Sequence, residues 1–299
     1  MKKRILSIIL TLTICVSAVA AASVNTCSAV SQGTGRVLPN EKPITLGVNE
    51  PYKQVLDVDA GNGDYVYVWT SNRSVFPDLS AMNSTPKVKY KVSNRRVILS
   101  LYPRQTGYAD ILCSTYKKSY WSDKDSWLKV TVKKAPAYIS LNKTSITLGI
   151  GETFDLNSYV NSGAAAYSRP YSSSNSRVAS VTKSGGLVTA KAVGTAKVTV
   201  KTYNGKTATC TVTVKKAPTK ISLNKTNLTL KVGQTFDLNS YVNSGSAAYS
   251  RPYSSSNAKV ASVTKSGGLV TAKSVGTAKI TVKTFNGKTA TCTVNVKKR

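Results

Sequence analysis

The chain has 299 residues and a formal net charge of +30, because 42 lysines and arginines outweigh 12 aspartates and glutamates. It contains no histidine, which excludes Ser-His-Asp and Cys-His catalysis and every metal site that depends on histidine. So large a positive charge favours a polyanionic partner, such as an anionic wall polymer, an acidic glycan, DNA or anionic lipid, and a purely solubilising charge is the alternative.

The N-terminus is predicted to be a secretory signal peptide over residues 1–22. Three cations precede the apolar run Ile5–Val16, and small alanines follow it. The run is shorter than the about 20 residues that a transmembrane helix needs. We expect cleavage after Ala22, with Ala29 as the alternative, and then an N-terminal tail over residues 23–36. The protein is therefore expected to be secreted or associated with the cell surface.

Residues 37–134 are predicted to form one domain, a divergent relative of the repeats that follow it. Its sequence DVDAGNGD places Asp57, Asp59 and Asp64 close together. A calcium loop would need a glutamate where Val68 stands, so a polar turn is the prediction and calcium the alternative.

Few carboxylates remain for catalysis. Asp123 and Asp125 lie in a loop of the same domain with no candidate acid–base partner nearby in the sequence. An enzyme with an unfamiliar carboxylate site would have to use them together with Asp57 and Asp59. We expect no catalytic residue, no metal and no cofactor.

A long aromatic loop precedes the last strand of this domain. Aromatic rings beside lysines can stack on sugar rings and meet acidic groups. We predict ligand contacts at Tyr116, Lys117, Lys118, Tyr120 and Trp121. In the alternative, Trp127 starts the last strand and packs inward while the other residues cover a neighbouring edge.

The remainder of the chain is a duplication. Residues 135–214 and 217–296 align without a gap and are identical at 66 of 80 positions. We expect a first repeat domain over 135–216 and a second over 217–299, the latter ending in a basic tail. Repeated small units are typical of reach, display or multivalent binding rather than of a single active site.

Each repeat consists of short runs with period-two alternation, separated by turn signals, which predicts an antiparallel β-sandwich. Asn204-Gly205 is a strong hairpin signal because both residues tolerate a positive φ. The alternation turns Cys210 inward as a small apolar side chain, and Cys292 and Cys113 likewise. In the first repeat the expected strands are Tyr138–Leu141, Ser145–Leu148, Thr153–Leu156, Tyr171–Ser173, Val178–Thr182, Leu187–Ala192, Thr195–Tyr203 and Lys206–Val214.

The loop Tyr-Ser-Arg-Pro-Tyr and the lysines are the candidate contacts in the repeats. Residues 215–299 hold 15 basic residues and one acid, against ten and two in residues 133–214. We therefore expect the affinity for polyanions to be greater in the second repeat. The loop adds the predicted ligand contacts Tyr167, Arg169, Tyr171, Tyr249, Arg251 and Tyr253.

The repeats resemble bacterial Ig-like domains of group 2. The matching motifs occur in order at Ile221–Asn224, Val260–Val263, Gly268–Ala272 and Gly276–Val282. The repeats depart from the family at Tyr171 and Tyr253, where tryptophan is usual. The resemblance implies an all-β fold of tandem immunoglobulin-like β-sandwich domains and an extracellular, non-catalytic module.

Short proline-containing joints between the domains predict an elongated, semi-rigid rod. The leading hypothesis is a secreted, non-enzymatic protein that acts as a cell-surface adhesion or structural module, held to anionic wall polymers by its basic repeats. The alternative is a specific carbohydrate-binding module that uses the N-terminal aromatic loop. Other surface proteins are further candidate partners, and nucleic acid and a membrane span are not expected. The ligand, the oligomeric state and whether the protein stays on the wall are open.

Overall fold

The computed structural model describes residues 42–58, 64–115 and 126–298. All regular elements in these ranges are strands, and no helix occurs among them. The strands fall into three units with separate hydrophobic cores, which we call unit 1 (residues 44–133), unit 2 (139–215) and unit 3 (221–297). The predicted all-β class is confirmed.

Unit 1 is a sandwich of a large and a small sheet. The large sheet has the order β1-β8-β7-β3-β4, with β5 also pairing with β3, and the small sheet pairs β2 with β6. The strands are β1 (Ile44–Gly47), β2 (Tyr52–Asp57), β3 (Tyr65–Thr70), β4 (Ser80–Ala81), β5 (Val88–Lys91), β6 (Arg96–Leu101), β7 (Gly107–Ser114) and β8 (Ser126–Lys133).

Unit 2 has a four-stranded sheet of order β10-β17-β16-β13, and its other strands form the sheets β11-β15-β14 and β12-β9. The strands are β9 (Ile139–Leu141), β10 (Ser145–Gly149), β11 (Thr153–Asp155), β12 (Ser158–Val160), β13 (Tyr171–Ser173), β14 (Ala179–Val181), β15 (Leu187–Ala190), β16 (Gly194–Lys201) and β17 (Thr207–Lys215).

Unit 3 repeats this plan, with the sheets β19-β26-β25-β22, β20-β24-β23 and β18-β21. The strands are β18 (Ile221–Leu223), β19 (Asn227–Lys231), β20 (Thr235–Asp237), β21 (Ser240–Val242), β22 (Tyr253–Ser255), β23 (Ala261–Val263), β24 (Leu269–Ala272), β25 (Gly276–Lys283) and β26 (Thr289–Lys297). In all three units the last strand pairs in parallel with a strand near the start, namely β8 with β1, β17 with β10 and β26 with β19.

The cores follow from the period-two patterns. In the hairpin of β16 and β17, Val198 stands opposite Cys210 and both are fully buried, whereas Thr199 and Thr209 face outward with their hydroxyls 3.2 Å apart. Burying a valine side chain stabilises such a core by about 1.5–3 kcal/mol. The inward placement predicted for Cys113, Cys210 and Cys292 is confirmed, and the three residues remain buried thiols.

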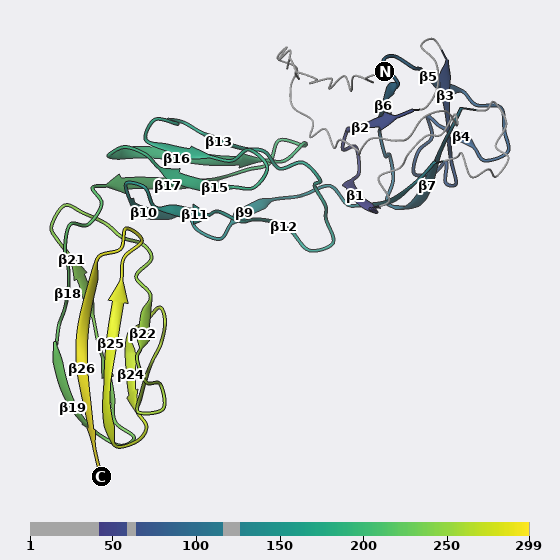
Figure 1. Ribbon diagram of the computed structural model, residues 1–299. Coiled ribbons are helices and arrows are strands. Elements are labelled where there is room, and N and C mark those ends of the chain that lie inside the picture. Colours follow the sequence, from purple (N-terminus) through teal and green to yellow (C-terminus); the bar gives the residue numbers. More distant parts are fainter. Residues whose placement is uncertain (1–41, 59–63, 116–125, 299) are drawn as a thin grey trace, which may run out of the picture.

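The units follow one another end to end, as expected of an elongated tandem arrangement (Figure 1). Unit 1 lies at the opposite end of unit 2 from unit 3 (Figure 1). The chain turns between β17 and β18, so that unit 3 runs across the direction of unit 2 (Figure 1). The two joints between units therefore decide the shape of the molecule.

The buried thiols give the first prediction. Burial raises the pKa of the Cys210 and Cys292 thiols, so that little of the reactive thiolate is present at neutral pH. In a Cys27→Ser background, a thiol reagent should modify the three core cysteines slowly in the native protein and completely in denaturant. Rapid native modification of Cys210 or Cys292 would contradict their placement in the core.

Candidate functional site

The Tyr-Ser-Arg-Pro-Tyr loop of each repeat lies at a joint between two units. At the first joint, the buried carboxylate of Glu50 in unit 1 accepts backbone N–H bonds from Tyr167 and Ser168 of unit 2, both at 2.9 Å. It also accepts the N–H of Gly47 in its own turn at 2.9 Å. One carboxylate thereby holds two units together, and we call this arrangement the glutamate clasp.

The second joint repeats the clasp. The carboxylate of Glu152, 2% exposed, accepts N–H bonds from Tyr249 at 2.8 Å and Ser250 at 2.7 Å, and from Gly149 in its own turn at 3.0 Å. Hydrogen bonds to a charged acceptor are the stronger ones, and their geometry fixes the position of the bound loop. The clasp therefore sets how each unit sits on the one before it.

A glycine makes each clasp possible. A Cβ on Gly47 would collide with the carbonyl oxygen of Ala165, and a Cβ on Gly149 would collide with that of Ala247 and lie 2.8 Å from the Phe285 ring. Any side chain at these two positions would push the next unit away. Glycine and glutamate, three residues apart, are thus both required.

Aromatic rings close the joints. Tyr167 packs edge-on against Tyr52 with ring centroids 5.1 Å apart, and Tyr249 packs in the same way against Phe154 at 5.0 Å. Such pairs contribute about 0.5–1.5 kcal/mol beyond the area they bury.

One hydrogen bond of the first joint has no counterpart at the second. At the first, the Tyr203 hydroxyl donates to the carbonyl oxygen of Val48 at 2.7 Å. Burial, and secondly the Glu50 charge, raises the pKa of Tyr203 to about 12, so it remains a donor. Phe285 occupies the corresponding place at the second joint and has no hydroxyl.

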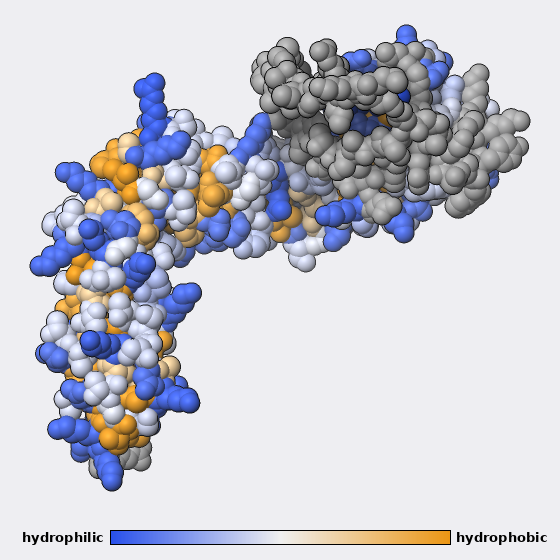
Figure 2. Space-filling model, viewed as in Figure 1, coloured by the Kyte–Doolittle hydropathy of each residue, from blue (hydrophilic) through white to orange (hydrophobic). Residues whose placement is uncertain are grey.

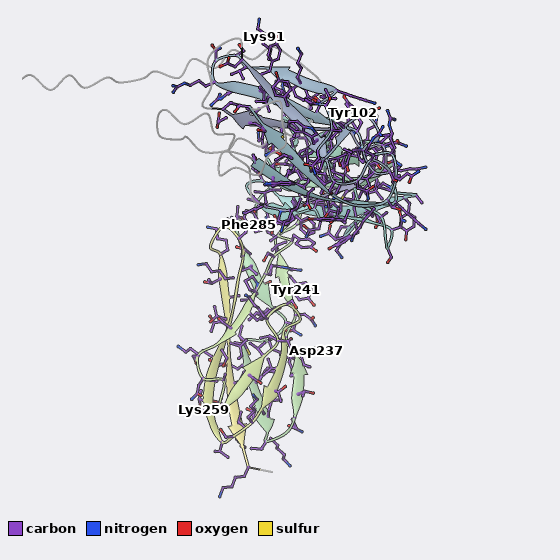
Figure 3. The ribbon with its side chains drawn as sticks, turned by 90° about the vertical axis from the view of Figure 1, so that its right-hand side faces the viewer. Lys91, Tyr102, Asp237, Tyr241, Lys259 and Phe285 are labelled. Atoms are coloured by element: carbon purple, nitrogen blue, oxygen red, sulfur yellow. The ribbon has the colours of Figure 1, made fainter. Side chains whose placement is uncertain are left out.

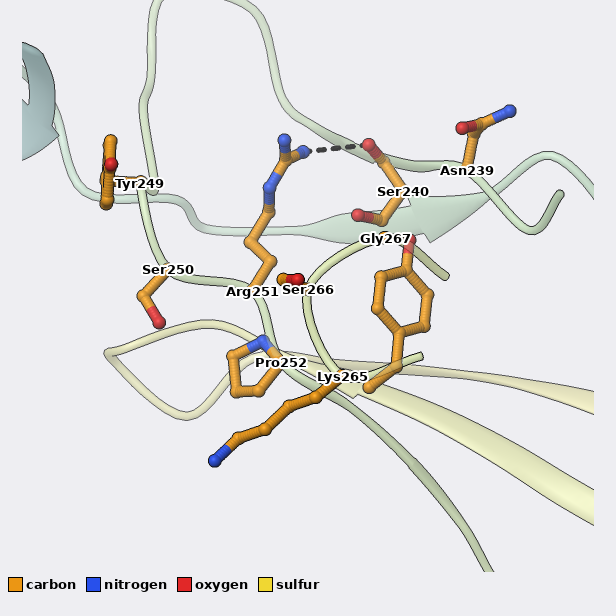
Figure 4. A pocket seen from close by; sticks show the side chains of 10 residues that line it. Asn239, Ser240, Tyr249, Ser250, Arg251, Pro252, Lys265, Ser266 and Gly267 are labelled. Carbon is orange, nitrogen blue, oxygen red and sulfur yellow. Dashed lines mark hydrogen bonds between the residues drawn. The ribbon is translucent and has the colours of Figure 1, made fainter. Parts of the chain in front are cut away.

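A pocket of about 430 Å³ opens in unit 3 beside the second joint (Figure 4). Arg251 Nη1 donates to the carbonyl oxygen of Ser240 at 2.8 Å, which holds the guanidinium at the pocket wall. Two cations and several hydroxyls line the pocket and no carboxylate does, so its chemistry suits an anionic or polyol group. The lining residues are Asn239, Ser240, Tyr249, Ser250, Arg251, Pro252, Tyr253, Lys265, Ser266 and Gly267.

The structure divides the predicted contacts of the repeats into three roles. Tyr167 and Tyr249 belong to the joints, and Tyr249 also lines the pocket. Arg169 donates to the Ser158 carbonyl at 2.9 Å, just as Arg251 does to that of Ser240. Tyr171 and Tyr253 are 7% and 8% exposed and pack in the cores, and Tyr253 also lines the pocket. The contacts predicted at Tyr116, Lys117, Lys118, Tyr120 and Trp121 lie outside the described residues.

The clasp glutamates were not among the predicted site residues. Their signal was present, because Gly47 and Glu50 recur at the same spacing as Gly149 and Glu152, and both positions change in unit 3. The sequence pattern within one unit, however, does not predict which backbone groups of the following unit the glutamate will contact.

The positive charge is exposed. Throughout residues 215–298 every lysine is solvent-exposed, and none of these lysines forms an ion pair with another described residue. The ion pairs formed between described residues lie in unit 1, at Arg96–Asp57 and Arg104–Asp78. Hydrophilic side chains project from the visible face of unit 3 along its length (Figure 2).

The other carboxylates that the structure describes form no evident site. Asp57 bonds to Arg96 Nε at 2.8 Å, whereas Asp59, Asp123 and Asp125 lie outside the described residues. Over residues 42–58, 64–115 and 126–298, no group of three or more metal-binding side chains comes together. The same ranges contain no helix of a length and hydropathy suited to crossing a membrane.

Comparison with known proteins identifies the type of repeat. The sequence model of the bacterial Ig-like domain (group 2) matches residues 137–212 and 217–294. No curated protein sequence matches the chain.

Solved structures resemble the chain at low identity. A structure of surface layer protein SbsC, domains 1–6, is 18% identical over 85% of this chain and 39% of its own length, with a TM-score of 0.26. The Escherichia coli adhesin FdeC is 15% identical over 88% of this chain and 96% of its own, with a TM-score of 0.25. A C-terminal intimin fragment is 18% identical over 62% and 65%, with a TM-score of 0.23. At these values the likenesses carry no argument about function.

The clasp gives the second prediction. Glu152→Ala leaves the part-buried N–H groups of Tyr249 and Ser250 without their acceptor, which should weaken the coupling of units 2 and 3 by about 1–3 kcal/mol. Small-angle scattering should show a broader range of end-to-end lengths. Asp155→Ala is the matched control, because this exposed carboxylate lies in the same unit. Identical scattering of the two variants would contradict the clasp.

Proposed function

The chain belongs to the bacterial Ig-like domain family of group 2, and from this premise we propose that it is a secreted, non-enzymatic module of the bacterial cell surface. In this role it acts in adhesion or as a structural spacer, with residues 1–22 removed as a signal peptide. The clasped joints support this proposal, because they give three small domains one fixed shape. We place the domains at residues 37–134, 135–216 and 217–299.

The anchoring ligand in this proposal is an anionic wall polymer. The observation that carries it is the set of exposed lysines of unit 3, none of which forms an ion pair within residues 215–298. The unpaired cations of one unit attract a polyanion through their summed electrostatic field. The polyanion releases its counterions when it binds. The scaffold itself supplies no compensating acid there except Asp237.

The pocket adds a local contact to this field. Arg251 and Lys265 would meet an acidic group, while the Ser250 and Ser266 hydroxyls would meet a sugar or polyol. Unit 2 carries the same loop, with Arg169 held in the same way. Two linked sites of one kind bind a repeating polymer more tightly than either alone.

The salt dependence of binding distinguishes this function from carbohydrate recognition by the Tyr116–Trp121 loop. Binding of the chain to purified wall should fall at least roughly tenfold between about 0.05 and about 0.5 M salt, because the contacts are ionic. Walls stripped of their anionic polymer should bind little protein at low salt. The carbohydrate-binding alternative would be favoured if binding depended neither on the salt concentration nor on the anionic polymer and were lost in Trp121→Ala.

A further inference from the structure

The far end of unit 3 corresponds to the face on which units 1 and 2 dock their successors. That face is the turn after β1 in unit 1 and the turn after β10 in unit 2, each with its glycine and glutamate. In unit 3 the corresponding turn follows β19 and carries Lys231 and Gln234. Both residues are exposed.

These two changes remove the docking geometry. Lys231 puts a long side chain where Gly47 and Gly149 leave no room even for a Cβ. Gln234 has no charge, and its Oε1 accepts the backbone N–H of Lys231 at 2.8 Å within the same turn. Each change also makes the face one charge more positive than the joint face of unit 2.

Further cations surround this turn. Lys231 is the register partner of Lys297 on the neighbouring strand, and Lys298 follows directly. The turn is tied to Ala272 by the N–H of Gly233 at 2.9 Å, which brings the adjacent Lys273 close.

Lys259 lies at the same end of unit 3, far from Phe285 at the joint, and Asp237 lies between the two ends (Figure 3). Lys273 N bonds to the Val260 carbonyl at 2.8 Å, so Lys273 and Lys259 neighbour each other. All of these lysines are exposed. We call Lys231, Lys259, Lys273, Lys297 and Lys298 the end face.

We propose that the end face binds the phosphate groups of an anionic polymer, so that the chain attaches end-on with units 1 and 2 pointing away. This deepens the proposed function and rests on it. The occupant follows from charge complementarity. A bound anion offsets the mutual repulsion of five ammonium groups on one face, and lysine meets phosphate as a point charge without a fixed bidentate geometry.

Two double variants of the full chain test the end face. Lys231→Gly with Gln234→Glu restores the joint sequence and lowers the net charge by two, because one cation is lost and one carboxylate is gained. Lys283→Gln with Lys288→Gln removes two charges from exposed positions beside the joint. Measured with poly(glycerol phosphate) as probe, the first variant should bind roughly tenfold more weakly than the unmodified chain and the second about threefold or less. The slope of log affinity against log salt should become shallower by about 1 in the first, which loses one lysine, and stay nearly unchanged in the second.

A further end-face variant, Lys297→Gln with Lys298→Gln, should lose as much affinity for the probe as the first variant. It replaces the first variant in the test if the altered turn impairs folding. Equal losses in end-face and joint-side variants would overturn the end face and leave general polyanion binding standing. If the unmodified chain does not bind the probe at any salt concentration, the proposed function itself fails.

Discussion

A buried carboxylate at each joint is the interaction on which the shape of this protein depends. Glu50 and Glu152 each take two backbone N–H groups from the next unit and one from their own turn. Burial raises the pKa of Glu50, because desolvation outweighs the hydrogen bonds it accepts. The contribution of Glu50 to the free energy of unfolding is therefore lost as pH rises from the ordinary glutamate pKa through the raised one. The gain from the clasp is orientation more than net stability.

The clasp also links the joint to the candidate ligand site. Tyr249 and Ser250 are held by Glu152 through their N–H groups and line the pocket with Arg251. A change in the angle between units 2 and 3 therefore moves part of the pocket wall. At the first joint the Tyr203 hydroxyl adds a bond to Val48 that Phe285 cannot make at the second.

The two repeats differ at few positions, but these differences change which partners each repeat can bind. The scaffolds share 66 of 80 residues, yet Lys231 and Gln234 replace the glycine and the glutamate of the joint. One pair of changes both removes a docking surface for protein and adds positive charge. Because polyanion binding depends on summed charge and docking depends on close fit, so small a change alters both properties at once.

The sequence alone was enough to determine the all-β class, the inward cysteines and the hairpin at Asn204-Gly205, because alternation and turn chemistry act over a few residues. It also showed that charge is concentrated in the second repeat, and its motifs pointed to the family. Only the tertiary structure decided that Tyr171 and Tyr253 pack in the cores and that Tyr167 and Tyr249 build joints. Glu152 meets the N–H of Tyr249 across 97 positions of sequence. Such a contact has no local period or propensity, so it exists only once two folded units meet.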